Sequence, residues 1–171
     1  FYGKDAIGRT HQVATIQLDF FQPEGFDLTC VNEDGKDERI VMIHCAVMGS
    51  IERFLSVLIE HFAGAFPVWL APEQVRILPI ADRHVATAEK TATELKQVGL
   101  RATVDDRSES VGKKIREAEV AKVPYMLVLG DKEAKAGSVA VRSYAKGDQG
   151  VKKLSAFAKA VSKEVETKAL S

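Results

Sequence analysis

The sequence has 171 residues, enough for one medium-sized domain or for a small domain joined to part of another. Hydrophobic residues make up 46% and charged residues 28%, a profile that is typical of a folded globular protein and excludes a disordered chain. The 24 basic residues equal the 24 acidic ones, which excludes a global positive field, so any nucleic-acid partner must be held by a local basic patch.

Cysteine content and hydropathy indicate where the protein works. Cys30 and Cys45 are too few for a disulfide-stapled secreted domain, and no apolar run is long enough to span a bilayer. No secretory signal opens the chain. We therefore expect a reduced setting, the cytoplasm or an organelle matrix, and no membrane partner. The chain starts at Phe1 without an initiator methionine and enters what reads as the middle of a domain, which predicts a fragment.

The first part of the chain predicts antiparallel β structure. Apolar and polar residues alternate from Ala14 to Phe20 with the two-residue period of a half-buried strand. A turn cluster at 32–36 and a second strand at 40–47 follow. Gly49 then interrupts the strand, and Ser50 can cap the next helix.

The helix predicted after Ser50 has apolar residues at helical spacing, so we expect one of its faces to be core. These residues are Ile51, Phe54, Leu55, Leu58 and Phe62. The proline-containing stretch 64–73 predicts a linker. We therefore expect two domains, residues 1–70 and residues 71–171.

After the linker the pattern changes to alternating strands and helices. The expected elements are strands at 75–80, 101–104, 125–129 and 139–142, helices at 83–97, 111–122 and 151–169, and a turn at 130–132. Their order, βαβαββα, predicts a sheet that is covered by helices and at least partly parallel. The expected fold class is α/β.

Two features of the first domain are candidates for chemistry. The Gly49–Phe54 junction leads from a strand end into a helix start, where free N–H groups attract anions, and Arg53 adds a planar cation that can stack on a base. An ordinary capped helix with a solvated Arg53 explains the same residues. His44 and Cys45 suggest zinc, but adjacent strand residues point to opposite faces, and a hydrogen-bonded structural histidine is the alternative.

Further polar residues leave two interpretations open. Gln12 and Gln17 can read a base edge or an amino-acid ligand, or they can simply be solvated. In the second domain, glutamate and arginine side chains can read splayed RNA bases, because glutamate accepts hydrogen bonds from base amino groups and arginine donates them in pairs. Charges on helix surfaces also serve solvation alone. The charged residues in question are Lys113, Lys114, Arg116, Lys122, Asp131, Lys132, Glu133 and Arg142.

Several segments together resemble the threonyl-tRNA synthetase family, over nearly the whole chain. Those that resemble its catalytic core are Phe1–Gly3, Thr15–Phe20, Val41–His44 and, as motif 3 of class II synthetases, Gly49–Phe54. Those that resemble its anticodon-binding domain and the junction into it are Phe66–Pro72, Gly112–Glu117, Val123–Val128 and Gly130–Glu133. The resemblance implies an α+β fragment of a class II antiparallel catalytic sheet, followed by a mixed-sheet anticodon-binding domain.

The resemblance implies roles in binding ATP and threonine. Arg53 matches the catalytic arginine that stacks on adenine, and Gln12 and Ser50 match residues that line the same ATP site. Tyr2 and Gln17 match residues around the threonine pocket.

The resemblance also implies a metal ligand and an RNA contact surface. His44 matches one ligand of a zinc ion that grips the amino and hydroxyl groups of threonine, which lets the site reject valine. Ser108, Glu133 and Arg142 match residues that read the anticodon bases. Ser108 stands where some relatives have asparagine.

The implied activity is a step of protein biosynthesis, the Mg²⁺- and ATP-dependent activation of threonine and its transfer to tRNA(Thr) by a homodimeric ligase. The other zinc ligands and motifs 1 and 2 of the family are not in this sequence, so we expect the chain alone to form no adenylate. Cys45 stands where the family usually has arginine, and residues that the family has after Gly3 are missing. A non-catalytic tRNA-binding module and a fragment of a prolyl, glycyl or histidyl synthetase are the alternatives.

Overall fold

The structure is a computed structural model that describes residues 1–170. The chain divides into two compact units, and the division falls between Phe62 and Ala63 rather than after residue 70. The stretch expected to be a linker packs onto the second unit, because Val68 is buried in its apolar core. The fully buried Gln74 also donates a hydrogen bond from Nε2 to the Val68 carbonyl at 2.8 Å.

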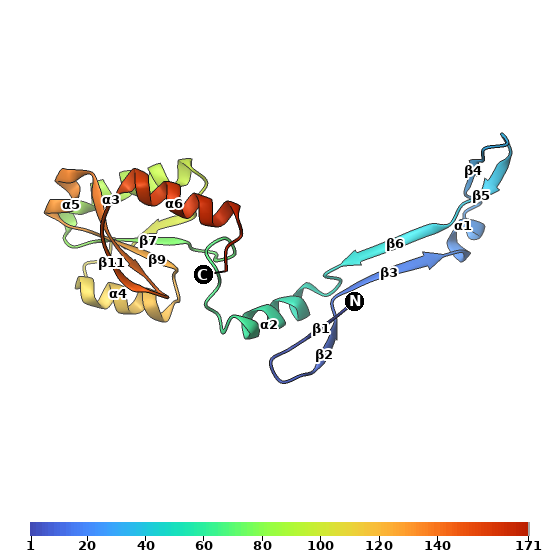
Figure 1. The fold of residues 1–171 in the computed structure, drawn as a ribbon, viewed down its shortest axis with the longest axis horizontal. Coiled ribbons are helices and arrows are strands. Elements are labelled where there is room, and N and C mark those ends of the chain that lie inside the picture. The colour runs from blue at the N-terminus through green and yellow to red at the C-terminus, as the bar shows by residue number, and fades with distance from the viewer. Residues whose placement is uncertain (171) are drawn as a thin grey trace. The chain divides into compact units, whose positions relative to one another are not determined.

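The first unit consists of antiparallel two-stranded ribbons and two helices (Figure 1). Its elements are β1 (Tyr2–Lys4), β2 (Thr10–Gln12), β3 (Ala14–Asp19), α1 (Phe21–Gly25), β4 (Thr29–Val31), β5 (Asp37–Arg39), β6 (Met42–Val47) and α2 (Ile51–His61). The pairs are β1 with β2, β3 with β6, and β4 with β5. The antiparallel prediction is confirmed, whereas α1 was not predicted.

The ribbon of β3 and β6 has two chemically different faces. Its register pairs Gln17 with His44 and Ile16 with Cys45. Because successive strand residues alternate between faces, His44 and Cys45 lie on opposite faces, as predicted. The face of Cys45 is apolar and open to solvent. Its residues Ile16, Leu18, Ile43 and Val47 are each more than half exposed.

The helix α2 forms where it was predicted, but the prediction that it buries a core face is wrong. None of its residues is buried, and Ile51 and Leu55 are 55% and 45% exposed. Across residues 1–62 only Asp5 and Pro23 are buried. Two-stranded ribbons offer too little surface to cover the apolar side of a helix, so this unit has no apolar core among the described residues.

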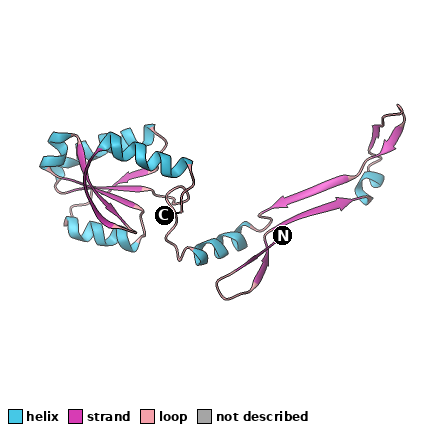
Figure 2. Ribbon diagram, in the orientation of Figure 1, coloured by secondary structure: helices cyan, strands magenta, loops and turns pink. Residues whose placement is uncertain are grey.

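The second unit is built on a five-stranded mixed sheet (Figure 2). Its strands, in the spatial order β11-β10-β9-β7-β8, are β7 (Val75–Pro79), β8 (Ala102–Val104), β9 (Tyr125–Leu129), β10 (Ser138–Ser143) and β11 (Gly147–Lys153). The strands β8, β7 and β9 are parallel, and β10 and β11 are antiparallel to their neighbours. The predicted mixed sheet is confirmed.

Helices cover both faces of this sheet. They are the short 3-10 helix η1 (Asp82–His84) and the α-helices α3 (Val85–Gln97), α4 (Val111–Val120), α5 (Asp131–Ala136) and α6 (Leu154–Glu166). Buried residues of α3 and α6 pack with Ile77 and Leu127 on one face. On the other face, Ala118 of α4 packs with Leu78 and Met126. Among the described residues, the buried apolar side chains all belong to this second unit, apart from Pro23.

Two predictions for the second unit are wrong. Residues 130–132, expected to be a turn, lead into the helix α5. The terminal helix begins at Leu154, because residues 147–153 form the edge strand β11 instead. The pairing of β11 with β10 forms a hairpin across residues 144–146, and this pairing outweighs the local helical spacing of the apolar residues.

None of the helices in the described part of the chain has both the length and the apolar composition that crossing a membrane requires.

Tyr125 couples the stability of the second unit to alkaline pH. Its hydroxyl donates to Oε2 of Glu164 at 2.9 Å, and burial together with this bond raises the pKa of Tyr125 to about 12. In an unfolded chain the pKa of tyrosine is about 10. Between these values the unfolded state loses a proton that the folded state keeps, so the free energy of unfolding should fall as pH rises from about 10 to about 12.

Urea unfolding followed at several pH values from about 9 to about 12 checks this expectation. The Tyr125→Phe variant should lose less stability over this range than the wild type, whereas Tyr144→Phe, at an exposed tyrosine, should behave as the wild type does. If wild type and Tyr125→Phe lose stability in parallel, another group causes the alkaline transition.

Candidate functional site

The first unit has a cleft where β2, β3, β6 and the start of α2 meet. It measures about 200 Å³, and Gln12, Ser50 and Arg53 are among its lining residues, with Thr15 and Ala46 between them. The structure therefore brings together the three residues that were predicted to bind ATP.

The start of α2 differs from the prediction in one respect. Ser50 occupies the N-cap position, but its hydroxyl accepts no hydrogen bond from the helix and instead lies 3.4 Å from Oε2 of Glu52. The first-turn N–H groups of α2 are thus not satisfied by this side chain. Such groups, together with the positive end of the helix dipole, favour an anion.

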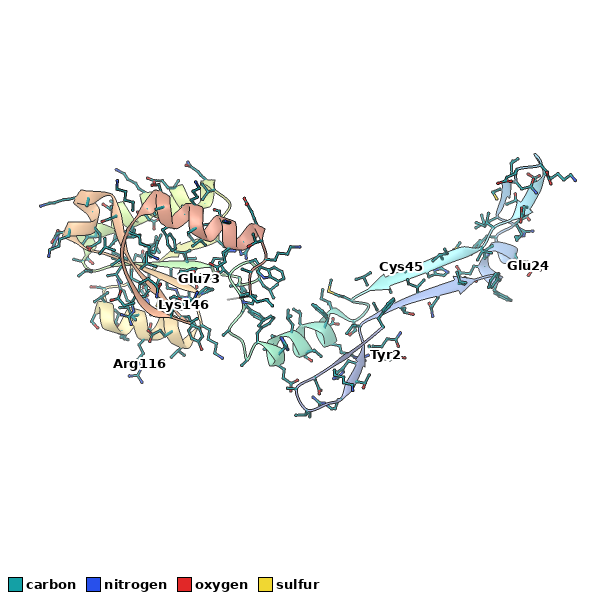
Figure 3. The ribbon with its side chains drawn as sticks, viewed as in Figure 1. Tyr2, Glu24, Cys45, Glu73, Arg116 and Lys146 are labelled. Atoms are coloured by element: carbon teal, nitrogen blue, oxygen red, sulfur yellow. The ribbon has the colours of Figure 1, made fainter. Side chains whose placement is uncertain are left out.

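A second, larger cavity of about 570 Å³ lies along the same ribbon. Gln17, Asp19 and His44 line it together with residues 20–22. The cross-strand pairing of Gln17 with His44 places both side chains on the face opposite Cys45, which Figure 3 labels on β6. Tyr2 does not line this cavity. It is 71% exposed and pairs with Gln12 on the β1–β2 hairpin, so its role stays a prediction.

The β1–β2 hairpin is closed by one buried carboxylate. Asp5 accepts hydrogen bonds from the Ile7 and Arg9 amides at 3.2 and 2.8 Å, from Arg9 Nε at 2.5 Å, and contacts His11 Nε2 at 3.0 Å. The contact with His11, followed by those with Arg9, holds the pKa of Asp5 well below its ordinary value. The hairpin pairs Gly3 with His11 and ends at Gln12, which lines the first cleft.

Asp19 is a site residue that sequence reasoning missed. Its Oδ2 lies 2.8 Å from Nε2 of His44, while its Oδ1 accepts hydrogen bonds from the amides of Phe21 and Gln22, both at 2.9 Å. The bond from Gln22, then the contact with His44, lower the pKa of Asp19. The two-residue period of β3 already placed Asp19 on the face of Gln17, and this was the signal available in the sequence.

The described residues fit a zinc ion only in part. His44 supplies one imidazole donor of the kind that zinc prefers, and zinc in proteins takes three or four protein ligands. Residues 1–170 bring no group of three or more histidine, cysteine, aspartate or glutamate side chains together. Cys45 lies on the other face of the ribbon. The described residues therefore do not form a complete zinc site.

In the second unit, the predicted RNA-reading residues lie on three different elements. Ser108 is exposed in the loop between β8 and α4, Glu133 lies on α5, and Arg142 lies on β10. No hydrogen bond or ion pair described for residues 1–170 joins any two of them. Glu133 accepts a hydrogen bond from the Gly130 amide at 3.1 Å through Oε2.

Arg142 has unused hydrogen-bonding capacity. It pairs with Met126 of β9, so its side chain lies on the α4 side of the sheet, where Nη2 is 3.6 Å from Oε1 of Glu119. Its Nε is buried and has no hydrogen-bond partner in the described structure. A buried donor without an acceptor is uncommon, and an incoming acceptor would satisfy it.

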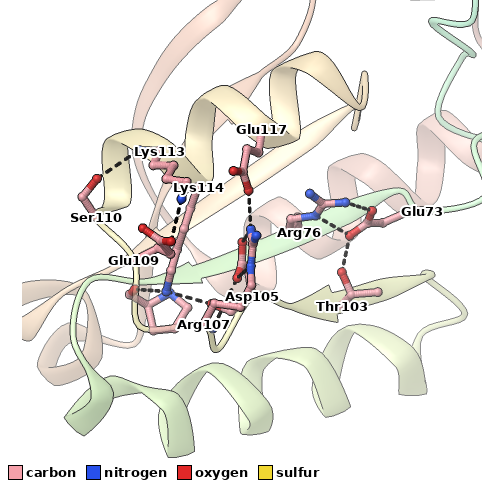
Figure 4. Close-up of polar contacts among 11 residues, drawn as sticks. Glu73, Arg76, Thr103, Asp105, Arg107, Glu109, Ser110, Lys113, Lys114 and Glu117 are labelled. Atoms are coloured by element: carbon pink, nitrogen blue, oxygen red, sulfur yellow. Dashed lines mark hydrogen bonds and ion pairs between the residues drawn. The ribbon is translucent and has the colours of Figure 1, made fainter.

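Charged contacts fix the loop that carries Ser108 (Figure 4). Arg107 donates from Nε and Nη2 to Asp105 at 2.8 and 2.6 Å and also from Nη2 to Glu117 at 2.6 Å. The Arg107 guanidinium is the main cause that lowers the pKa of Asp105. Lys114, expected on a charged surface, is instead 3% exposed and donates to the carbonyls of Asp105 and Pro79. The start of the loop is thereby fixed by the Arg107 contacts and by the hydrogen bond from Lys114 to the Asp105 carbonyl.

Known families match both units. Residues 4–62 match the tRNA synthetase class II core domain (G, H, P, S and T), and residues 74–164 match the anticodon binding domain. The chain thus combines part of a class II synthetase core with an anticodon-binding domain.

Individual proteins that are similar to this chain indicate which kind of class II synthetase it resembles. The chain is 53% identical over 170 residues to a threonine–tRNA ligase of Syntrophomonas wolfei, covering 99% of this chain and 27% of that protein. It is 53% identical over 168 residues to a threonine–tRNA ligase of Clostridium tetani, covering 98% and 26%. A solved structure of the RNA binding domain of threonyl-tRNA synthetase from Cryptosporidium parvum is 34% identical, with a TM-score of 0.85, covering 95% of this chain and 41% of that one.

The chain belongs to the anticodon-binding domain family, and over nearly its whole length it is similar to threonine–tRNA ligases. It spans about a quarter of the length of the curated relatives that it matches, as the covered shares of 27% and 26% state.

Proposed function

We propose that this chain acts as part of a threonine–tRNA ligase, in which its first unit contributes to the site for ATP and threonine and its second unit binds the anticodon of tRNA(Thr). In this reaction the threonine carboxylate attacks the α-phosphate of ATP to give threonyl-adenylate and pyrophosphate. The 3′-terminal ribose of the tRNA then takes the threonyl group. The same proposal includes ATP and threonine as substrates and Mg²⁺ bound with the ATP. It also includes a homodimeric whole enzyme and a cytoplasmic location.

The two cavities of the first unit support the catalytic part. Arg53 offers a planar cation to stack on adenine, and the uncapped first turn of α2 offers N–H groups to phosphate oxygens. Gln17 and His44 line the second cavity along the same ribbon, which suits a substrate that spans a nucleotide and an amino acid. These residues contribute by positioning the reactants and stabilising charge rather than by covalent chemistry.

His44 is the residue of this chain that would hold zinc. When bound, zinc supplies a Lewis acid that holds the amino and hydroxyl groups of threonine. Valine lacks the hydroxyl group, and a site built to bind that group rejects the isostere strongly. Gln17, paired with His44 across the ribbon, adds an amide that can hydrogen-bond the same substrate.

The observation that carries the anticodon part is the unsatisfied Nε of Arg142. Unstacked anticodon bases expose acceptors on their edges, and arginine matches paired acceptors in its fixed planar geometry. Glu133 complements it, because its carboxylate can accept from base amino groups.

Fluorescence anisotropy of the 171-residue chain with a threonine anticodon stem-loop, at one fixed salt concentration, tests this proposal. Arg142→Ala and Glu133→Ala should each weaken binding by about 1–3 kcal/mol, roughly 5- to 150-fold in Kd. Changing the central anticodon base should have a similar effect on the wild type and a smaller one on Arg142→Ala.

The matched control is Arg39→Ala, which removes the same charge from β5 of the first unit. It should leave the Kd nearly unchanged. Weak binding that is abolished by salt and shows no base preference would contradict anticodon reading and leave only general attraction to phosphate.

A further inference from the structure

We infer that Asp19 is a positioning residue for His44, holding the imidazole with its proton on Nε2 so that Nδ1 is the nitrogen presented to a ligand. The identity of that ligand as a zinc ion, an acceptor of an electron pair, rests on the function proposed above. The hydrogen-bond arrangement itself rests only on contacts within the first unit.

The carboxylate of Asp19 is held by backbone hydrogen bonds that do not involve His44. Its Oδ1 accepts hydrogen bonds from the backbone amides of Phe21 and Gln22, both at 2.9 Å, at the start of α1. These two bonds set the plane of the carboxylate and direct Oδ2 to His44 at 2.8 Å. The Asp19 side chain is 17% exposed, against 42% for His44, so the carboxylate is the better shielded partner of the pair.

The chemistry of the pair then determines which ring nitrogen carries the proton. An ionised carboxylate accepts hydrogen bonds and donates none, so Nε2 of a neutral His44 must be the donor. The neutral ring has one proton, which leaves the lone pair on Nδ1. None of the hydrogen bonds described for residues 1–170 involves Nδ1 of His44. Histidines that bind metals typically donate their other N–H to a carboxylate or carbonyl in this way.

This arrangement goes beyond the matching of His44 to a metal ligand, because it predicts which atom binds. A ligand at Nε2 would have to displace Asp19, whereas a ligand at Nδ1 meets a ring that is already oriented. The negative charge of Asp19 also makes the imidazole a stronger electron-pair donor.

The substitution Asp19→Asn tests the inference sharply. The asparagine oxygen should stay at the two backbone amides, which can bond only to an acceptor, so the amide nitrogen should point at His44. An N–H donor there requires Nε2 to be the acceptor. We therefore expect the proton to move to Nδ1 and the tautomer of His44 to invert.

The readout is the pair of imidazole ¹⁵N shifts of His44, from long-range ¹H–¹⁵N spectra of the 171-residue chain at about pH 8.5, where ordinary imidazoles are neutral. Free imidazoles already favour the Nε2 proton, so the wild type alone does not discriminate and the inversion is the decisive result. The amide signals of Phe21 and Gln22 report whether the substituted side chain keeps its two backbone bonds.

Asp34→Asn is the matched control, since it makes the same change in an exposed turn of the same unit. It should leave the His44 shifts unchanged, and His11, which contacts Asp5, should be unaffected by either variant. An identical tautomer in wild type and Asp19→Asn, whether the unit is folded or not, would overturn the inference. The stem-loop titration does not involve Asp19, so each result can fail without the other.

Discussion

Replacement of Leu127 by alanine is expected to lower the free energy of unfolding of the second unit by about 2–5 kcal/mol. Leu127 is fully buried in the middle of β9, which is paired on both sides, with β7 and with β10. Its side chain packs in the cluster formed with α3 and α6. Regular strands on both sides prevent the backbone from closing the gap, so the variant loses both the burial of the leucine and the contacts of the atoms around the cavity.

Urea unfolding followed by tryptophan fluorescence measures this change. Trp69 is the single tryptophan of the chain and lies in the second unit, so its emission reports that unit. Leu127→Ala should move the midpoint to lower urea with little change in slope. Leu170→Ala removes the same atoms from a side chain that is 76% exposed and should leave the midpoint in place. An unchanged midpoint for Leu127→Ala would mean that the sheet does not form around this residue.

Replacement of Gln74 by leucine is expected to cost about 2–4 kcal/mol, because each buried polar group left without a partner costs about 1–3 kcal/mol. The Gln74 side chain donates from Nε2 to the Val68 carbonyl and accepts from the Arg101 amide through Oε1, both at 2.8 Å. Leucine has a similar volume but can replace neither bond. The residue thus ties the segment before β7 to the start of β8.

The same urea experiment checks this second expectation, with Gln97→Leu as the control. Gln97 is exposed at the end of α3, so the same chemical change there should be nearly neutral. Arg101 also donates to the carbonyls of Trp69 and Ala71, which keeps part of the segment attached in the Gln74→Leu variant. Equal stability of Gln74→Leu and wild type would show that water satisfies the two backbone groups.

The parts of the fold that follow from local sequence were predicted well. The apolar run 125–129 and the alternation that begins at Ala14 both form strands where expected. The helix α3 ends before Gly99, whose φ of +82° suits a residue without a side chain. Each of these signals lies within a single strand or helix, so the element can be predicted without knowing what packs against it.

The parts that depend on contacts between elements were not predictable in this way. The strand β11 exists because β10 offers it a partner, and nothing in residues 147–153 alone requires a strand. The absence of a buried face on α2 is likewise not visible in its sequence, since helical spacing predicts an apolar stripe and not what covers it.

The same distinction applies to the candidate sites. Gln12, Ser50 and Arg53 were expected to share a cleft, and the structure brings them together. Lys114 was grouped with surface charges, because its sequence gives no sign of the two strand-end carbonyls that bind its ammonium. Asp19 was overlooked since its partner, His44, comes from a strand that lies 25 residues further along the chain.

The exposed apolar face of the β3–β6 ribbon has a consequence for ligand affinity on its opposite face. A two-stranded ribbon is only marginally stable alone, so the cavity of Gln17 and His44 exists for a fraction of the time that depends on how well the ribbon is supported. The apparent dissociation constant of any ligand equals its intrinsic value divided by that fraction. Whatever covers Ile16, Leu18 and Ile43 therefore tightens binding at His44 without touching the ligand.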